Sequence, residues 1–196
     1  MNSLDNNEKI IEILKIRLSK KRYIHSRNVA DEARRLAERY GGDPEKAYTA
    51  GLLHDICKEI TPEEQKHYVS LSLRDVSEEE KKVPALWHAV AGAYYSEFVL
   101  GFHDEDILNA VRYHTVGRGG MSLLEEIVYM ADLTSADRSY KDVTRMRKLA
   151  ASDLTKAMLE AVKFSVSDVM AKGSLIPVHT IDAYNYYSQK CKGGSQ

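Results

Sequence analysis

Ionisable side chains recur on the apolar faces of predicted helices, and this pattern constrains the fold more than any other feature of the sequence. The residues concerned are His25, His54, His88, His114 and Asp132. His25, for example, is followed at helical spacing by Val29 and Ala33, which share its face of the helix. The other four residues follow the same rule on separate helices, so we predict that all of them point into one interior.

Burying such groups has a cost that must be offset. An unpaired carboxylate or imidazole costs several kcal/mol to bury, unless its pKa shifts until it is neutral. A lone buried histidine is usually a hydrogen-bonded core residue. Several together indicate a divalent cation, which supplies positive charge to carboxylates and accepts the lone pairs of neutral imidazoles. His67 and His103 lie in charged segments and are predicted at the surface, and His179 stays undecided.

The chain is predicted to be all-α, because helix signals recur along it and no run of alternating β-branched residues indicates a strand. Capping sequences precede the helical patterns at Asp5, Asp43, Thr61, Ser77 and Ser122, and Gly41 provides a helix stop. We expect helices near residues 6–19, 23–40, 44–58, 62–70, 84–100, 104–115, 122–136, 143–150 and 153–172, and a last one from about 180.

Length and composition favour one soluble domain. The 196 residues suit a single helical domain over 1–192, with 193–196 as a disordered tail and 71–83 as a charged surface connection. A net charge of −1 argues against a nucleic-acid partner, and no segment approaches the roughly 18 apolar residues of a membrane span. The N-terminus lacks a secretory pattern and two cysteines make no disulfide framework, so we expect a cytoplasmic protein.

His54 and Asp55 are adjacent, which limits where they can act together. Neighbouring residues in a helix point about 100° apart and do not share a face. Both side chains can reach one metal ion only near the end of the helix, where other helices supply the remaining ligands. The segment from Cys57 to Pro62 contains Thr61-Pro62 and indicates that the helix ends there.

Six segments carry a resemblance to a known family. They are RYIHS (22–26), GLLHDICK (51–58), WHAVAGA (87–93), RYHTVGRGGM (112–121), ADLTSADR (131–138) and IPVHTIDAYNYY (176–187). With them the chain resembles the HD superfamily of metal phosphohydrolases, and more closely its bacterial symmetrical bis(5'-nucleosyl)-tetraphosphatase branch, over about residues 22–187. The resemblance implies an HD-domain helical bundle with the metal site in the interior of the core helices.

The resemblance also implies residue roles. The metal ligands would be His25, His54, Asp55 and Asp132, with iron as the favoured ion; imidazole and carboxylate ligands also suit Mn, Co or Zn. Three of these ligands, His25, Asp55 and Asp132, would also contact the substrate, together with a larger set of residues. That set comprises Arg22, His88, His114, Thr115, Arg138, Ser174, Leu175, Ile176, Pro177, Val178 and His179.

The implied reaction is the metal-dependent hydrolysis of diadenosine tetraphosphate to two ADP, by attack of a metal-activated water on an inner phosphate. His88, His114 and Lys58 are the candidate catalytic residues, as phosphate ligands or as the proton donor to the leaving group. Two alternatives stay open here. His88 and His114 could complete a second metal site, and Lys58 could simply favour a helix C-terminus through the helix dipole.

The remaining candidates have simpler interpretations. Arg118 lies in a glycine-rich segment that is predicted to be an interhelical turn, and Trp87 and Cys57 are predicted to pack in the core. Alternative functions are another nucleotide phosphohydrolase, such as a nucleotidase or a phosphodiesterase, and a non-catalytic nucleotide sensor. The expected partner is a dinucleoside polyphosphate or a nucleoside diphosphate, and the resemblance alone implies a homodimer.

Overall fold

The computed structural model describes residues 3–193, and within this range the chain forms α-helices joined by turns, with no strand. The helices are α1 (Ser3–Arg17), α2 (Lys20–Tyr40), α3 (Pro44–Leu53), α4 (Pro62–Leu71), α5 (Glu78–Lys82), α6 (Pro84–Phe98), α7 (Glu105–Tyr113), α8 (Leu123–Thr134), α9 (Val143–Ser152), α10 (Leu154–Ala171) and α11 (Val178–Gly193). The all-α prediction is confirmed. Each helix between residues 3 and 193 is too short or too polar to cross a bilayer.

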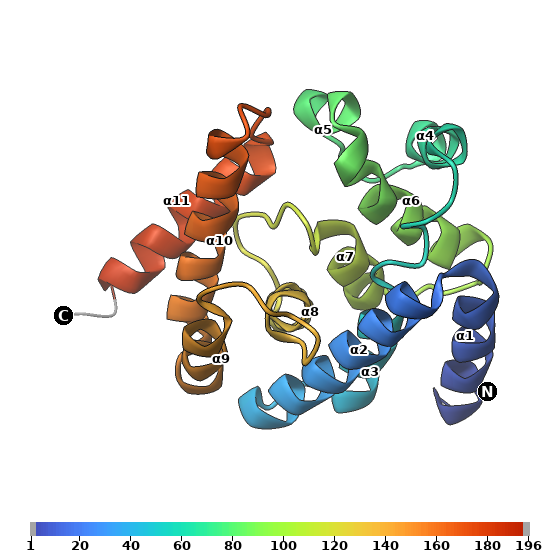
Figure 1. The fold of residues 1–196 in the computed structure, drawn as a ribbon, viewed down its shortest axis with the longest axis horizontal. Coiled ribbons are helices and arrows are strands. Elements are labelled where there is room, and N and C mark those ends of the chain that lie inside the picture. Colours follow the sequence, from blue (N-terminus) through green and yellow to red (C-terminus); the bar gives the residue numbers. More distant parts are fainter. Residues whose placement is uncertain (1–2, 194–196) are drawn as a thin grey trace.

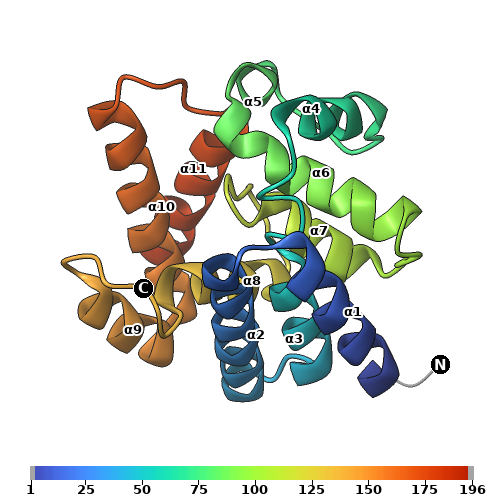
Figure 2. The ribbon, with the colours of Figure 1, turned by 45° about the vertical axis from the view of Figure 1, so that its right-hand side comes forward.

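Two apolar clusters fill the molecule, and α2 and α8 contribute to both of them. One cluster joins these two helices to α9, α10 and α11, and the other joins them to α1, α3, α6 and α7. Figures 1 and 2 show the same order, with α9–α11 on one side of the molecule and α4–α7 on the other. Since α2 carries His25 and α8 carries Asp132, these two side chains lie where the clusters meet.

Helices α2 and α3 approach closely because Gly51 has no side chain. A Cβ at this position would lie 2.6 Å from the Cα of Ala30 and 2.9 Å from its backbone nitrogen. Such distances are far inside van der Waals contact, so only glycine fits here. The close approach brings His25 of α2 next to His54, which follows the end of α3.

Most predicted helix termini are confirmed. Four of the predicted N-caps accept hydrogen bonds from amides of the first turn: Asp43, Thr61, Ser77 and Ser122. Gly41 ends α2 in the left-handed conformation, with φ of 73°. The cap predicted at Asp5 is wrong, because α1 begins at Ser3 and includes it. The last helix begins at Val178 and continues to Gly193, and the predicted tail otherwise falls on 194–196, outside the described residues.

The helix predicted over 44–58 is too long, because α3 ends at Leu53 and turns follow. Nδ1 of His54 donates to the Gly51 carbonyl at 2.7 Å. In a continued helix that carbonyl would accept from the amide of Asp55. The amide of Lys58 instead bonds three residues back, to the Asp55 carbonyl at 2.9 Å. His54 and Asp55 therefore stand at a helix end, as their adjacency requires.

The prediction of a surface connection over 71–83 is also wrong in part. This segment contains α5, which starts with a complete capping box between Ser77 and Glu80. Glu80 is buried and forms an ion pair with the buried Arg112, Nη1 to Oε1 at 2.8 Å. Nδ1 of His179 lies 2.8 Å from Glu80 Oε2, so the histidine left undecided in the sequence is also part of this network. The charged composition of the segment predicts exposure for all of it, whereas the carboxylate of Glu80 is buried.

The Glu80 network gives a testable pH dependence. Burial raises the pKa of Glu80, but hydrogen bonds from His179 and Arg112 outweigh it and lower this pKa from 4.5 to about 2. A lowered folded-state pKa means that the stabilisation is complete above pH 4.5 and is lost as the pH falls toward 2. We expect Glu80→Gln to lower the free energy of unfolding by about 3 kcal/mol at pH 7, as for a broken buried ion pair.

The difference between wild type and Glu80→Gln should shrink between pH 4.5 and 2, measured by urea unfolding at several pH values. The contribution of His179 to stability has the opposite pH dependence. Glu80 raises the pKa of His179, so the stabilisation from its positive charge is present at low pH and is lost as the pH rises. A difference that stayed constant down to pH 2 would mean that the Glu80 charge contributes nothing.

Candidate metal centre

Each of the four inward-facing histidines is held through its Nδ1 atom. The pairs are His25 with Asp137 Oδ2 at 2.8 Å, His54 with the Gly51 carbonyl at 2.7 Å, His88 with the Ala85 carbonyl at 2.9 Å, and His114 with the Val111 carbonyl at 2.7 Å. All four partners are acceptors, so Nδ1 carries the hydrogen in each ring. In the neutral imidazole this leaves the lone pair on Nε2, which is the atom available to bind a cation.

The Nε2 atoms gather around two carboxylates. Asp55 Oδ2 lies 3.4 Å from His54 Nε2 and 3.9 Å from His25 Nε2. Asp55 Oδ1 lies 3.3 Å from His88 Nε2 and 3.7 Å from His114 Nε2. Asp55 therefore faces all four imidazoles, two with each oxygen. Asp132 Oδ1 completes the set, at 3.0 Å from His25 Nε2 and 3.9 Å from His54 Nε2.

These residues fit a divalent cation. Nε2 of His25 and Nε2 of His54 are both buried and make no hydrogen bond within residues 3–193. Their lone pairs face the oxygens of Asp55 and Asp132, which repel them unless positive charge lies between. Donor atoms of His25, His54 and Asp55 lie within 4.8 Å of one another, close enough to share one ion. This arrangement, which apolar packing does not explain, supports the metal binding expected from the sequence.

The electrostatics of the centre agree with a cation. Burial by itself lowers the pKa of His54, but the charges of Asp55 and Asp132 outweigh it and raise that pKa. Burial likewise raises the pKa of Asp55, yet His54 and His114 hold it well below its usual range. The carboxylates thus stay ionised, and the negative field that raises the pKa of His54 also attracts a metal ion.

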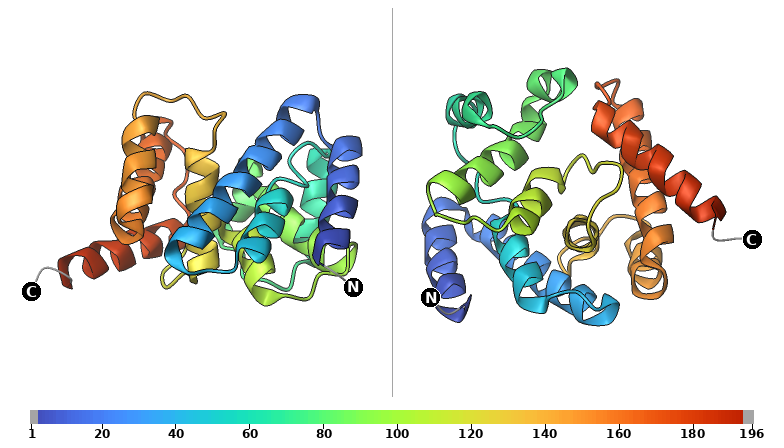
Figure 3. Two further views of the ribbon diagram at one scale, coloured as in Figure 1. Left: turned by 90° about the horizontal axis from the view of Figure 1, so that it is seen from below. Right: turned by 180° about the vertical axis from the view of Figure 1, so that it is seen from behind.

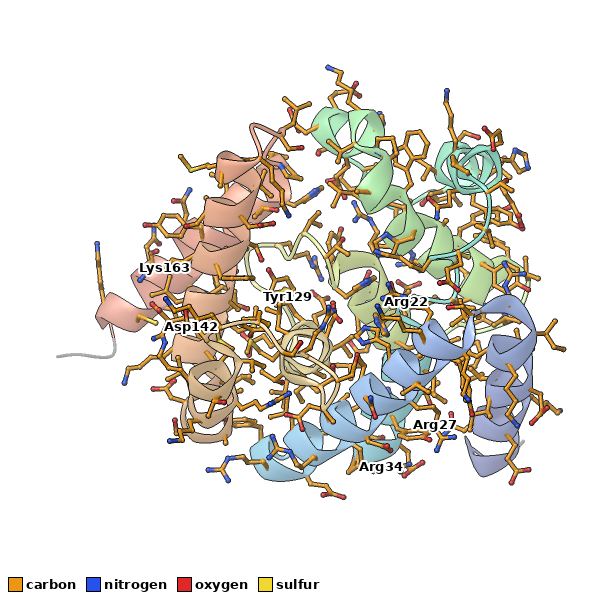
Figure 4. All side chains as sticks on the ribbon, viewed as in Figure 1. Arg22, Arg27, Arg34, Tyr129, Asp142 and Lys163 are labelled. Atoms are coloured by element: carbon orange, nitrogen blue, oxygen red, sulfur yellow. The ribbon has the colours of Figure 1, made fainter. Side chains whose placement is uncertain are left out.

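Two arginines reach the carboxylates from the solvent side. Arg22 Nη1 donates to Asp55 Oδ2 at 2.8 Å, and Arg138 donates to Asp132 Oδ1 and, at 2.7 Å, to its backbone carbonyl. Their side chains are 29% and 35% exposed. Figure 4 places Arg22 on the side of α2 that faces the middle of the molecule, whereas Arg27 lies on the outer side. The two guanidinium groups are positioned to meet an anion that approaches the centre.

Lys58, His88 and His114 form a second polar group beside Asp55. Lys58 Nζ lies 3.1 Å from His88 Nε2, and His88 Nε2 lies 3.3 Å from His114 Nε2. Burial lowers the pKa of Lys58, of His88 and of His114. Together with Asp55, the two histidines also satisfy the spacing of a metal site. The lysine next to His88 favours an anion at this place over a second cation.

The predicted substrate segment 174–179 leads into α11. Thr180, just beyond it, donates from Oγ1 to the Val116 carbonyl at 2.9 Å, so the segment lies beside the turn that follows His114. Thr115 Oγ1 in that turn is buried and makes no hydrogen bond. His179 is buried, and its Nε2 lies 3.0 Å from Asp75 Oδ2. Its side chain therefore faces carboxylates rather than the centre.

Most of the other sequence predictions near the site are confirmed. His67 and His103 are exposed. Burial raises the pKa of Cys57 to about 12, so it stays a thiol in the core. Arg118 donates from Nε to Glu125 Oε2 at 2.9 Å, within the turn that follows α7. The prediction that Trp87 packs in the core is wrong in part, because Trp87 is only partly buried and its indole nitrogen donates to the Glu80 carbonyl at 3.1 Å.

Sequence reasoning missed Asp137, Glu80 and Arg112. Asp137 follows Asp132 by five residues in the segment ADLTSADR and anchors His25 from a distance of 112 residues along the chain. Arg112 has no exposed surface and lies within the segment RYHTVGRGGM. The segments that indicated the family thus contained two of the missed residues, but no periodicity argument distinguishes them from surface charges.

Asp137 should tune metal affinity without binding the metal. It accepts from Nδ1 of His25 and from Asn28 Nδ2 at 3.1 Å, which fixes the orientation of the His25 ring. Loss of such a supporting carboxylate weakens metal affinity by about 10–100-fold. We expect this loss for Asp137→Asn in competition titrations with a chelating dye, and no change for Asp142→Asn, an exposed residue of the same loop. Equal affinities would contradict the role of Asp137.

Comparison with known proteins identifies the family. The HD domain family matches residues 22–137, and the chain therefore belongs to the HD-domain family. It is 38% identical over 181 residues to the symmetrical bis(5'-nucleosyl)-tetraphosphatase of Bacillus subtilis, which covers 92% of this chain and 97% of that protein. The Halalkalibacterium halodurans protein of the same name is 34% identical over 182 residues, 92% of this chain and 96% of that protein. Within the family, the chain belongs to this tetraphosphatase branch.

A solved structure agrees with the fold. The crystal structure of a predicted HD superfamily hydrolase involved in NAD metabolism from Clostridium acetobutylicum matches with a TM-score of 0.89 and 39% sequence identity. The match covers 94% of this chain and 97% of that one. The HD-domain helical bundle expected from the sequence is thereby confirmed, including the helices beyond residue 137.

Proposed function

We infer that the protein is a symmetrical bis(5'-nucleosyl)-tetraphosphatase, which hydrolyses diadenosine tetraphosphate to two molecules of ADP. Relatives with this name match nearly the whole chain. The observation that carries the chemistry is the set of Nδ1-anchored imidazoles that direct Nε2 toward Asp55 and Asp132. A divalent cation at such a centre lowers the pKa of coordinated water and offsets charge on phosphoryl oxygens.

We propose that His25, His54, Asp55 and Asp132 hold this cation and that Arg22 and Arg138 bind phosphate oxygens of the substrate. The two arginines contact the carboxylates that face the centre and keep partial exposure to solvent. A guanidinium can bind two phosphate oxygens at once, which orients the tetraphosphate as well as attracting it.

Lys58, His88 and His114 are the proposed phosphate and proton-transfer residues. Burial lowers the pKa of Lys58, which makes its Nζ a better proton donor near neutral pH than an exposed lysine. Nδ1 of His88 and Nδ1 of His114 each donate to a backbone carbonyl, so Nε2 of the neutral rings accepts, and each ring donates from Nε2 to a phosphate oxygen once it is protonated. We assign to Lys58 Nζ, in contact with His88, the proton that the departing ADP requires.

The nucleoside part of the substrate is proposed to lie near Thr115 and residues 174–179. The unpartnered hydroxyl of Thr115 offers a hydrogen-bonding group there. Leu175 and Val178 are 48% and 49% exposed, which provides apolar surface for a base. The segment lies beside the turn after His114, so a ligand with phosphates at the centre is within reach of it.

The test is product chromatography with diadenosine tetraphosphate and protein loaded with Fe, Mn or Co. ADP should be the sole nucleotide product. Formation of ATP and AMP would overturn the symmetrical assignment. Faster release of inorganic phosphate from mononucleotides than hydrolysis of diadenosine tetraphosphate would favour another nucleotide phosphohydrolase. Tight nucleotide binding without turnover under every metal would favour a sensor.

Four finer features are proposals of ours. Iron is proposed as the ion, supported by a mixed imidazole and carboxylate ligand set. A homodimer is supported by exposed apolar side chains on the C-terminal helices, such as Phe164 and Met170. A cytoplasmic location is supported by Cys57, which is a buried free thiol. A single domain over 1–192 is supported by the two core clusters, which share Leu124.

A further inference from the structure

The C-terminal helices lie outside the HD domain match, which ends at residue 137. Helix α11 packs on α10, and its last turns extend beyond the rest of the molecule (Figure 3). Buried polar side chains along α11 contact residues of the HD domain match. His179 contacts Glu80, Thr180 donates to the Val116 carbonyl, and Tyr187 donates to Glu126 Oε1 at 2.7 Å. These polar contacts, together with the apolar packing of Ala183 and Tyr187, set where α11 meets the core.

Glu80 lies at the centre of the first of these contacts. Its Oε2 accepts from Nη2 of Arg112 at 3.0 Å and lies 2.8 Å from His179 Nδ1. Arg112 Nη2 also donates to the Asp75 carbonyl at 2.5 Å, and His179 Nε2 lies 3.0 Å from the Asp75 carboxylate. With carboxylates at both of its nitrogens, the His179 ring is held as an imidazolium. One carboxylate therefore connects α5, α7 and α11.

These partners lie on two sides of the proposed nucleoside site. Arg112 is followed by Tyr113 and His114, and the Arg112 guanidinium lies 4.7 Å from the centre of the Tyr113 ring. The ring of Tyr113 in turn contacts the ring of His179, with centroids 5.7 Å apart. His179 ends the segment 174–179. Glu80 thus connects the chain around His114 to segment 174–179.

The position of Glu80 in α5 indicates that its carboxylate does more than fill space in the core. The helix has five residues, and Glu80 is its only buried one. An apolar side chain would contribute more to packing, and a buried ion pair is often no more stabilising than a well-packed apolar pair. The capping box holds this short helix in place, with Glu80 Oε2 accepting from the Ser77 amide at 3.0 Å. The capping box and the short helix together place the negative charge of Glu80 next to Arg112 and His179.

We propose that Glu80 is a positioning residue for the nucleotide: through Arg112 and His179 it holds segment 174–179 against residues 113–116, and so sets affinity for the nucleoside part of the substrate. The proposal rests on the proposed function. Glu80 makes no contact with His25, His54, Asp55 or Asp132 in the network described, so metal binding and the affinity for bare phosphate do not depend on it.

The test compares Glu80→Gln with wild type and with Glu78→Gln. Glu78 is an exposed carboxylate of the same helix that pairs with Lys81 at 2.7 Å. Four quantities are measured on metal-loaded, full-length protein at a temperature where circular dichroism shows it folded. They are KM for diadenosine tetraphosphate, Ki for ADP, Ki for inorganic phosphate, and metal content per chain, and kcat is recorded in the same assays. Thr180→Val and Tyr187→Phe loosen α11 without changing charge and serve if Glu80→Gln does not fold.

For Glu80→Gln we expect KM and the Ki for ADP to rise about tenfold or more, while kcat, the Ki for phosphate and the metal content stay within about threefold. Glu78→Gln should behave as wild type, and Thr180→Val and Tyr187→Phe should raise KM in the same way. Parallel losses of phosphate affinity and metal would overturn the proposal in favour of a purely structural role, as would an unchanged KM. Wild-type protein that fails to hydrolyse the substrate would instead refute the proposed function.

Discussion

Replacing Asp55 by asparagine is expected to remove both the metal ion and the activity. The two oxygens of Asp55 face all four Nε2 atoms, at 3.3 to 3.9 Å. Asparagine keeps the size of the side chain but removes the charge that balances a divalent cation. If the ion supplies about 4 kcal/mol of transition-state stabilisation, kcat/KM should fall about 10³-fold.

Metal content by elemental analysis and kcat/KM for diadenosine tetraphosphate measure this outcome. Asp31→Asn is the matched control, because Asp31 is an exposed aspartate of α2, the helix that carries His25. It should leave both quantities unchanged. An Asp55→Asn protein that keeps its metal and works within tenfold of wild type would rule out this centre as the site of hydrolysis.

Replacing Gly51 by alanine is expected to cause a large loss of stability. The added Cβ would meet the Ala30 Cα at 2.6 Å and the Val29 carbonyl carbon at 3.2 Å. These are backbone atoms of α2, so relief requires the two helices to separate. Overpacking of this kind costs about 1–3 kcal/mol and sometimes more. With rigid backbone on both sides we expect about 3 kcal/mol, or a fall in Tm of about 6–12 °C for a chain of this length.

Gly51→Ala should also disturb the metal centre. The Gly51 carbonyl accepts from Nδ1 of His54, and α2 carries His25, so separation of the helices moves the two Nε2 atoms apart. Metal affinity should therefore fall together with Tm. Gly92→Ala is the control: its Cβ would meet the Val111 Cγ1 at 3.3 Å, an atom of a side chain that can shift. A similar loss in both variants would show that the approach of α2 to α3 is not special.

Much of this architecture is visible in the sequence because the signals are local. The N-caps at Thr61, Ser77 and Ser122 depend on residues three apart, and all three form. The inward direction of His25 follows from the apolar residues spaced along its own helix. The sequence predicts the end of α3 too late. The hydrogen bond from His54 to the Gly51 carbonyl ends this helix, and helix propensities do not include side-chain bonds of this kind.

The sequence by itself determined the helical fold and the inward direction of the candidate metal ligands, because helical period and residue type are properties of short stretches of chain. The tertiary structure alone decided how those candidate ligands are held. Asp137 orients His25 across 112 residues, and Glu80 reaches His179 across 99. Hydrogen bonds between distant segments fix which nitrogen of a ring faces a carboxylate and which charge is buried. Such pairings form only when the whole chain has packed.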